Sequence, residues 1–209
     1  MALDEVLLGC CEIPVLRVYC WERPTVSFGY FEPLVNLPME YREGQYDLVR
    51  RWTGGGVVVH GSDWTYSLIV PHRFLGDIGG TAGSYAAVHR AIGDLLIASG
   101  IEASIVDGDR KAGGVDCFVS PVRSDVMVGS QKVAGAAQRR TRAGMLHQGS
   151  IQGIRVPGGF ARHLAERLAE EVRAVDGLER ELEEKAADLA LRKYGTAGWL
   201  EGASRLGRS

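Results

Sequence analysis

Three consecutive glycines, Gly54–Gly56, lie inside the stretch RRWTGGGVVVH, and they constrain the fold more than any other local feature. The residues on both sides read as β-strands, because they are rich in β-branched and aromatic side chains. A two-residue hairpin turn needs at most two glycines, and the β-branched Thr53 is a poor choice beside such a turn. We therefore expect a loop whose bare backbone lies against a ligand; a flexible hairpin turn is the alternative.

The residues around this loop indicate a ligand with a carboxyl or phosphate group. Arg50 and Arg51 supply positive charge just before the glycines, and backbone N–H groups of successive glycines can bind such a group. The loop is not a Walker motif, because no Gly-Lys-Ser/Thr follows it. It is not the dinucleotide fingerprint either, because a strand rather than a helix follows the glycines.

The order of predicted elements indicates the fold class. Strand patterns come first, followed by one amphipathic helix, further strands and two final helices, and a short helix opens the chain. This order favours an α+β fold, a single domain with mixed, mostly antiparallel sheets flanked by helices, over a Rossmann series. The expected strands are 15–21, 25–30, 47–52, 56–60, 64–71, 101–107, 126–128, 133–138 and 148–151. The expected helices are 1–9, 83–100, 164–172 and 178–191, with 31–46 a helix broken by two prolines.

Composition narrows the function class. The chain has 209 residues and a formal net charge of −2, so no basic field indicates nucleic acid. Its four cysteines lack zinc spacing and are a poor disulfide framework, so we expect no metal and a reducing, cytosolic compartment. Acidic residues stand where a signal peptide needs basic ones, and no apolar run reaches membrane-spanning length, so we expect neither export nor a membrane.

Two residues of the central region are candidates for covalent chemistry. Cys117 lies between glycine-rich segments, and Lys132 stands among small residues in GSQKVAGAAQ. A cysteine becomes reactive when a cation holds its thiolate, so the two residues would form a nucleophile and its activator if they meet in space. His147 is the other candidate activator. The alternative is a buried inert cysteine and a solvated lysine at a strand edge.

The motifs RRWTGGGVVVH, YSLIVP and KVAGAAQRRTRAGMLHQGSI, in this order, resemble the superfamily of lipoate–protein ligases, octanoyltransferases and biotin–protein ligases. MALDEVLL, LRVYCWERPTVSFGYF and ALRKYGTAGWL are similar to its terminal segments, so the resemblance covers nearly the whole chain. It implies a lipoate/biotin-ligase-like catalytic domain over 1–209. The motifs differ from those of biotin ligases, and lipoate ligases usually have Arg-Asn-Asp before the lysine strand and a full accessory C-terminal domain, for which this chain ends too soon.

The segment DCFVSP, the cysteine-to-lysine spacing and GAAQRR instead resemble the cysteine-loop octanoyltransferases. This resemblance implies that an octanoyl group moves from acyl carrier protein to a lysine of a lipoyl domain or the glycine cleavage H protein, without a cofactor. Cys117 would be the acyl-thioester nucleophile, and Lys132 would lower its pKa and hold the acyl carbonyl. The implied substrate-binding residues are Arg51, Gly54, Gly55, Gly56, His60, Gly135, Ala136, Ala137, His147 and Gly149.

Further expectations concern the acyl chain and the partner proteins. An eight-carbon chain needs an apolar tunnel, for which Val57–Val59, Tyr66 and Leu68 are candidates. A basic patch of Arg123, Arg139, Arg140 and Arg142 is a docking surface for acidic partners or a solvated turn. Two other functions stay open: an ATP- and Mg-dependent lipoate–protein ligase, and a non-catalytic module that binds an acyl chain or carrier protein.

Overall fold

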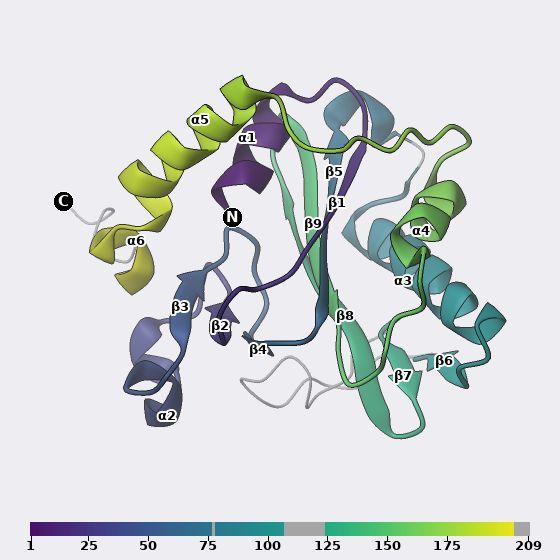
Figure 1. The fold of residues 1–209 in the computed structure, drawn as a ribbon, viewed down its shortest axis with the longest axis horizontal. Helices are drawn as coiled ribbons and strands as arrows, with labels where there is room; N and C mark the ends of the chain where they lie inside the picture. Colours follow the sequence, from purple (N-terminus) through teal and green to yellow (C-terminus); the bar gives the residue numbers. More distant parts are fainter. Residues whose placement is uncertain (77, 107–123, 203–209) are drawn as a thin grey trace.

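The computed structural model describes residues 1–76, 78–106 and 124–202, which form two sheets enclosed by helices (Figure 1). The large sheet has the strand order β1-β5-β9-β8-β7-β6, and all neighbouring strands in it are antiparallel. Its strands are β1 Val15–Tyr19, β5 Trp64–Pro71, β6 Ala103–Ile105, β7 Val126–Val128, β8 Gln131–Arg140 and β9 Gly144–Ile151.

The small sheet has the order β3-β2-β4 and is built from β2 Thr25–Phe28, β3 Asp47–Arg50 and β4 Val57–His60. Strand β2 pairs parallel with β3 and antiparallel with β4. The two strands that the glycine triplet joins therefore flank β2 and do not pair with each other. The hairpin alternative for the triplet is wrong, because a hairpin turn joins neighbouring strands.

Helices cover both faces of the large sheet (Figure 1). Helices α3 and α4 lie on one face, and α1 and α5 pack together on the other. The helices are α1 Ala2–Cys10, α2 Met39–Arg42, α3 Thr81–Ala98, α4 Phe160–Leu168, α5 Arg180–Leu189 and α6 Ala197–Glu201, with 3-10 turns at Leu34–Asn36 and His72–Phe74 and a π-helical turn at Ala190–Tyr194.

Strand β5 is central because its apolar side chains are buried on both faces. Tyr66, Leu68 and Val70 pack into the core against α3, whereas Ile69 packs against α1 beside Leu7. Successive side chains of a strand point to opposite faces, so the run YSLIVP, which is apolar except for the buried Ser67, suits a strand covered on both sides.

The fold class and most predicted elements are confirmed. In α3 the predicted apolar face, which includes Val88 and Ile92, is buried, and Gly100 has a left-handed φ of 82° just after the helix. The helical pattern predicted to reach Val172 ends at Leu168, and Val172 is exposed. Residues 31–46 form only short helical turns.

None of the described helices is both long and apolar enough to cross a membrane. The extent of the catalytic domain, residues 1–209, stays a prediction.

Candidate functional site

The loop between β3 and β4 is held by one arginine and by the close approach of the backbone that follows β2. Arg51 donates from one guanidinium nitrogen to the carbonyls of Gly54 and Gly56, at 3.0 and 2.7 Å. Gly55 has a φ of 84°, which favours glycine. A Cβ on Gly29 would lie 1.9 Å from the carbonyl oxygen of Gly55, so the approach of the two backbones needs glycine there too. The loop is therefore fixed by several groups of the protein.

Arg51 and His60, both predicted to bind substrate, are buried and joined through Ser27. Arg51 donates to Ser27 Oγ at 2.8 Å, and that oxygen lies 2.6 Å from His60 Nε2. The other ring nitrogen, Nδ1, lies 2.7 Å from Asp63 Oδ2. Ser27 and Asp63 were missed in the sequence. The three-residue spacing from His60 to Asp63 across a turn was the available signal for the second.

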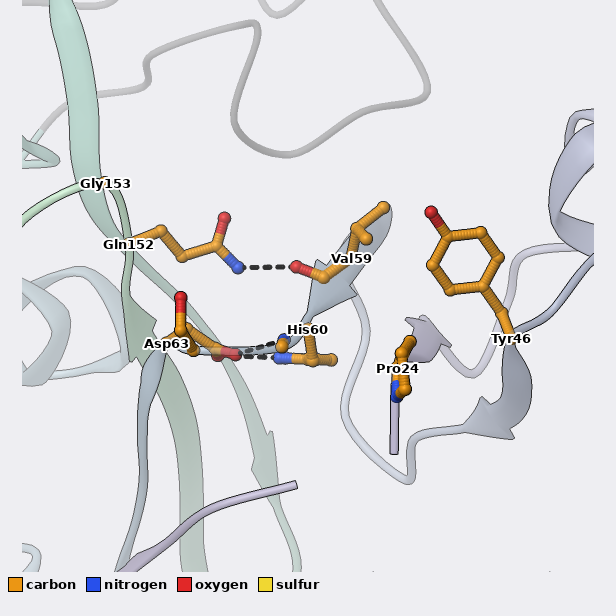
Figure 2. A pocket seen from close by; sticks show the side chains of 9 residues that line it. Pro24, Tyr46, Val59, His60, Asp63, Gln152 and Gly153 are labelled. Carbon is orange, nitrogen blue, oxygen red and sulfur yellow. Dashed lines mark hydrogen bonds and ion pairs between the residues drawn. The ribbon is translucent and has the colours of Figure 1, made fainter. Parts of the chain in front are cut away.

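A cleft of about 370 Å³ opens beside this group, where the small sheet meets the end of β9. Figure 2 shows His60 and Asp63 paired on its wall, opposite Tyr46 and Pro24. Gln152 Nε2 donates to the carbonyl of Val59 at 2.9 Å and so joins the two sheets at the cleft (Figure 2). The remaining lining residues are Gly61, Ser62 and Gly153.

Lys132 is buried at the start of β8 and forms an ion pair with Asp125, with 2.8 Å between Nζ and Oδ2. The hydroxyl of Tyr85 donates to the other carboxylate oxygen at 2.5 Å and accepts from the backbone N–H of Ala136 at 3.3 Å. Two predicted residues, Lys132 and Ala136, are thus joined by Asp125 and Tyr85, which the sequence did not reveal.

A β-bulge accompanies Lys132. The pairing of β7 with β8 shifts register between Val126 and Met127, so Val133 is an extra residue on β8. Val133 and Ala134 consequently both belong to the core against α3, although they are consecutive. Such bulges change the direction of the neighbouring side chains, and here the change falls next to the buried lysine.

His147 lies on the α3 side of β9, where Gln138 Nε2 donates to its Nδ1 at 2.9 Å and the Tyr66 hydroxyl is 3.1 Å from its Nε2. Burial, together with His89, holds the pKa of His147 well below its usual range. Burial also lowers the pKa of His89 to about 4. Both rings are therefore neutral at pH 7. Gly149 leaves the room that Tyr66 fills, since a Cβ there would lie 2.6 Å from the Tyr66 ring.

Gln148 is the residue of this segment that touches the glycine loop. Its side chain accepts from Thr53 Oγ1 at 2.8 Å and donates to the buried carboxylate of Asp4 at 2.7 Å. The structure therefore brings Gln148, and not His147, to the loop. The side-chain alternation of a strand explains the difference, because neighbours in β9 point to opposite faces.

Arg139 and Arg140 of the predicted basic patch donate to backbone carbonyls, and the predicted tunnel residues lie in two different cores. Arg139 packs its guanidinium over Trp52, 4.6 Å from the ring centroid, and donates to the carbonyl of Trp52 at 3.2 Å. Arg140 donates to the carbonyl of Gly80 at 2.8 Å. Of the predicted tunnel residues, Tyr66 and Leu68 lie in the core against α3, whereas Val57 lies in the core of the small sheet.

Cys117 and Arg123 lie outside the described residues, and the pairing of Cys117 with Lys132 stays a prediction. The roles assigned to the glycine loop, Gly135 and Ala137 in binding the acyl group stay predictions as well. Among the residues that the structure describes, no cluster of three histidine, cysteine or acidic side chains is suited to hold a metal ion.

Comparisons with known proteins agree with the motifs. Residues 1–153 match the family model of the lipoyl protein ligase A/B catalytic domain. The chain is 35% identical over 165 residues to octanoyltransferase LipM of Symbiobacterium thermophilum, and 36% identical over 163 residues to that of Moorella thermoacetica. Each alignment covers 72% of this chain and 59% of the relative, so the chain spans about three fifths of these relatives.

Solved structures show the same fold at low sequence identity. A lipoate-protein ligase A bound with ATP has a TM-score of 0.75 and 22% identity, with 96% of this chain and 92% of the other covered. The bipartite lipoate protein ligase of Thermoplasma acidophilum has a TM-score of 0.73 and 20% identity, with 98% and 91% covered. These similarities support the fold, while the octanoyltransferases are the more similar sequences.

Proposed function

The chain belongs to the lipoyl protein ligase A/B catalytic-domain family, and we propose that it is an octanoyltransferase of lipoate biosynthesis. The donor is octanoyl-acyl carrier protein, and the acceptor is a lysine of a lipoyl domain or of the glycine cleavage H protein. Similarity to several octanoyltransferases favours this activity over ATP-dependent ligation. The proposal includes a cytosolic location, because the described cysteines Cys10, Cys11 and Cys20 are free thiols.

The observation that carries the proposal is the buried ion pair of Lys132 and Asp125. Lysine is almost never buried without a partner, because the desolvation of an ammonium is costly. Here the ammonium is held 2.8 Å from a carboxylate whose other oxygen is fixed by Tyr85. A cation fixed in this way is suited to stabilise a thiolate or a developing oxyanion, which a mobile surface lysine does poorly.

The proposed reaction has two acyl transfers. The Cys117 thiolate attacks the octanoyl thioester, the bond between the carbonyl carbon and the donor sulfur breaks, and the donor leaves as a thiol after taking up a proton. The acceptor lysine, as a neutral amine, then attacks the acyl-cysteine. An amide forms, and Cys117 leaves as thiolate while the amine loses its proton. Thioester exchange is near thermoneutral, so the scheme uses no ATP, Mg or other cofactor.

Intact-protein mass spectrometry tests the first transfer. The chain is mixed with octanoyl-acyl carrier protein without ATP, as wild type, Cys117→Ser and Cys20→Ser. The proposal expects one octanoyl group on wild type and on Cys20→Ser, removable by hydroxylamine, and none on Cys117→Ser. The exposed thiol of Cys20 makes it a matched control for non-specific acylation.

Other outcomes would identify the alternatives. Acylation of a lipoyl domain that needs ATP and survives Cys117→Ser would establish a lipoate–protein ligase. Binding of the carrier protein without any adduct, with or without ATP, would establish a non-catalytic module. Addition of an unmodified lipoyl domain to the acyl-enzyme tests the second transfer.

A further inference from the structure

Four buried side chains form a continuous hydrogen-bonded chain through the small sheet: Asp63, His60, Ser27 and Arg51. The three contacts measure 2.7 Å from Asp63 Oδ2 to His60 Nδ1, 2.6 Å from His60 Nε2 to Ser27 Oγ, and 2.8 Å from Ser27 Oγ to Arg51. Ser27 comes from β2, His60 ends β4, and Arg51 directly follows β3. This hydrogen-bonded chain of side chains therefore crosses all three strands of the small sheet.

The chemistry of the groups gives this chain one direction. Arginine can only donate, so Ser27 Oγ accepts from Arg51; an ionised carboxylate can only accept, so His60 Nδ1 donates to Asp63. In that tautomer His60 Nε2 accepts the proton of the Ser27 hydroxyl. The Asp63 carboxylate therefore fixes the tautomer of His60 and, through it, the direction of the Ser27 hydroxyl.

Two donors besides His60 fix the Asp63 carboxylate at its end of the hydrogen-bonded chain. Its Oδ1 accepts from the backbone N–H of Gly61 at 3.0 Å, and its Oδ2 also accepts from Thr65 Oγ1 at 2.8 Å. Burial alone would raise the pKa of Asp63, but the hydrogen bond from His60, with those two donors, holds the pKa below its ordinary value. The Trp21 ring stacks on His60 at 4.3 Å between centroids and covers it.

The other end of the chain reaches the glycine loop. The guanidinium nitrogen of Arg51 that does not face Ser27 binds the carbonyls of Gly54 and Gly56. Glycine has the largest backbone freedom of any residue, so a loop with three of them has one conformation only if other groups hold it. Arg51 is such a group, and Ser27 fixes the rotation of its planar fork.

The same residue types in the same order form serine-nucleophile triads, but this group is not one. The side chain of Ser27 is fully buried, with 0% exposure, and its oxygen already accepts a hydrogen bond from Arg51. A nucleophile needs an open approach to its oxygen. The chain instead ends on the backbone of the predicted ligand-binding loop.

We propose that Asp63, His60 and Ser27 are positioning residues, which hold Arg51 and, through it, the glycine loop in the conformation that receives the acyl group. The role of this conformation in receiving the acyl group rests on the proposed function, whereas the hold on the loop does not. It gives His60 a role different from direct contact with substrate, and it assigns a role to Asp63 and Ser27.

Asp63→Asn is the informative variant, because it keeps the size of the side chain and removes its charge. The amide cannot accept at both oxygen positions, so either the Gly61 N–H or the Nδ1 proton of His60 loses its acceptor. Asp47→Asn is the matched control, since Asp47 lies in the same small sheet in a solvent-exposed pair with Arg23. Hydrogen exchange of the peptide covering residues 51–60 is measured together with the rate of acylation of Cys117.

We expect Asp63→Asn to raise exchange in this peptide by roughly tenfold or more and to slow acylation by a similar factor, with exchange in α3 unchanged. His60→Gln, which keeps an acceptor and a donor at similar places, should retain most of both properties, whereas His60→Leu should lose them. If His60 had a structural role unrelated to these hydrogen bonds, His60→Gln and His60→Leu would not differ in this way.

The result that overturns the inference is a peptide 51–60 that exchanges alike in wild type, Asp63→Asn and His60→Leu. If Asp63→Asn does not fold, the comparison of His60→Gln with His60→Leu decides the question. If wild type takes no octanoyl group, the proposed function fails, but the exchange measurement still decides whether these residues hold the loop.

Discussion

At the residue scale, Lys132 and Asp125 are each costly to bury, and each stabilises the charge of the other. Both side chains are at most 5% exposed, and the distance between their charged atoms is 2.8 Å. A buried ion pair contributes little net stability compared with apolar residues, but loss of one partner leaves an uncompensated charge. This asymmetry makes the pair a sensitive place for substitution.

A double-mutant cycle measures the coupling of the two charges. We predict that Lys132→Met and Asp125→Asn each lower the free energy of unfolding by about 3 kcal/mol or more, because each removes an opposite charge 2.8 Å from its buried partner. The double variant should lose less than the sum, with a coupling of about 2 kcal/mol. Urea denaturation followed by circular dichroism gives the four free energies.

The exposed pair Arg162 and Glu166, one turn apart in α4, is the control. Arg162→Met and Glu166→Gln should leave the urea midpoint unchanged, because water screens surface pairs. Additive losses at Lys132 and Asp125 would contradict the prediction and would mean that their charges are balanced by other groups.

At this scale, the sequence identifies a site residue when that residue is unusual among its neighbours along the chain. Lys132 and Arg51 could be selected because each is a charge beside small or glycine residues. Asp125, Tyr85 and Ser27 could not, because their importance comes from partners that are 7, 51 and 33 residues away along the chain. Cys117 was selected because it lies between glycine-rich segments, and its role remains a prediction.

At the element scale, the glycine loop depends on a glycine outside it. Gly29 follows β2, and its missing side chain lets the carbonyl of Gly55 approach to 1.9 Å from where a Cβ would be. Backbone atoms on both sides cannot give way as a flexible side chain would. Strand β2 and the loop are therefore packed backbone to backbone.

We predict that Gly29→Ala displaces the loop, lowers the melting temperature by several degrees and strongly reduces acyl transfer. A loss of about 2 kcal/mol or more is expected, as for other forced overpacking, and differential scanning fluorimetry measures it. Gly9→Ala is the control, because Gly9 lies in α1 with no atom within 4 Å of a Cβ, and alanine favours a helix. Equal effects of the two substitutions would contradict the packing argument.

The sequence predicts strands and helices where a single residue pattern is long, but it does not predict which strands pair with each other. The apolar face of α3 follows from periodicity, and β5 follows from its run of β-branched and aromatic residues. The parallel pairing of β2 with β3 does not, because it depends on the route that residues 29–46 take between them. Val172 was assigned to a helix by spacing, but it lies beyond the end of α4 and is exposed.

At the scale of the whole molecule, the C-terminal segment returns to the segments that flank the glycine loop. Arg50 donates to the carbonyl of Leu200 at 2.9 Å and to the carbonyls of Tyr30 and Glu32, both at 2.8 Å. Trp199 donates in turn to the carbonyl of Arg50 at 3.1 Å. One buried guanidinium thus joins α6 to the segment after β2.

We predict that Arg50→Lys loosens this junction, because one ammonium cannot reach the carbonyls on both sides of the fork. Hydrogen exchange should rise in residues 196–201 and in residues 29–32 together, while α3 is unaffected. Arg23→Lys, at an exposed arginine near the small sheet, is the control and should change neither segment. Exchange that rises in only one of the two segments would show that they are held independently.

The acid sensitivity of the whole fold follows from two buried histidines. Burial lowers the pKa of His89 from 6.5 to about 4, and it lowers the pKa of His147 well below 6.5. Between these values the unfolded chain binds more protons than the folded chain, so the free energy of unfolding rises with pH. The contribution is fully present above pH 6.5 and is lost as the pH falls through the folded pKa values.

We predict that the urea midpoint falls between pH 6.5 and 4, with His89 alone contributing about 3 kcal/mol over this window. His89→Asn keeps a donor for the carbonyl of Ser124, which His89 Nδ1 reaches at 2.8 Å, and cannot be protonated. It should reduce proton uptake on unfolding at pH 5.5 by close to one proton. His163→Gln, at an exposed position of α4, controls for the loss of one histidine in the measured pH dependence. If His89→Asn left it unchanged, the acid sensitivity would have to come from carboxylates, and its window would lie below pH 4.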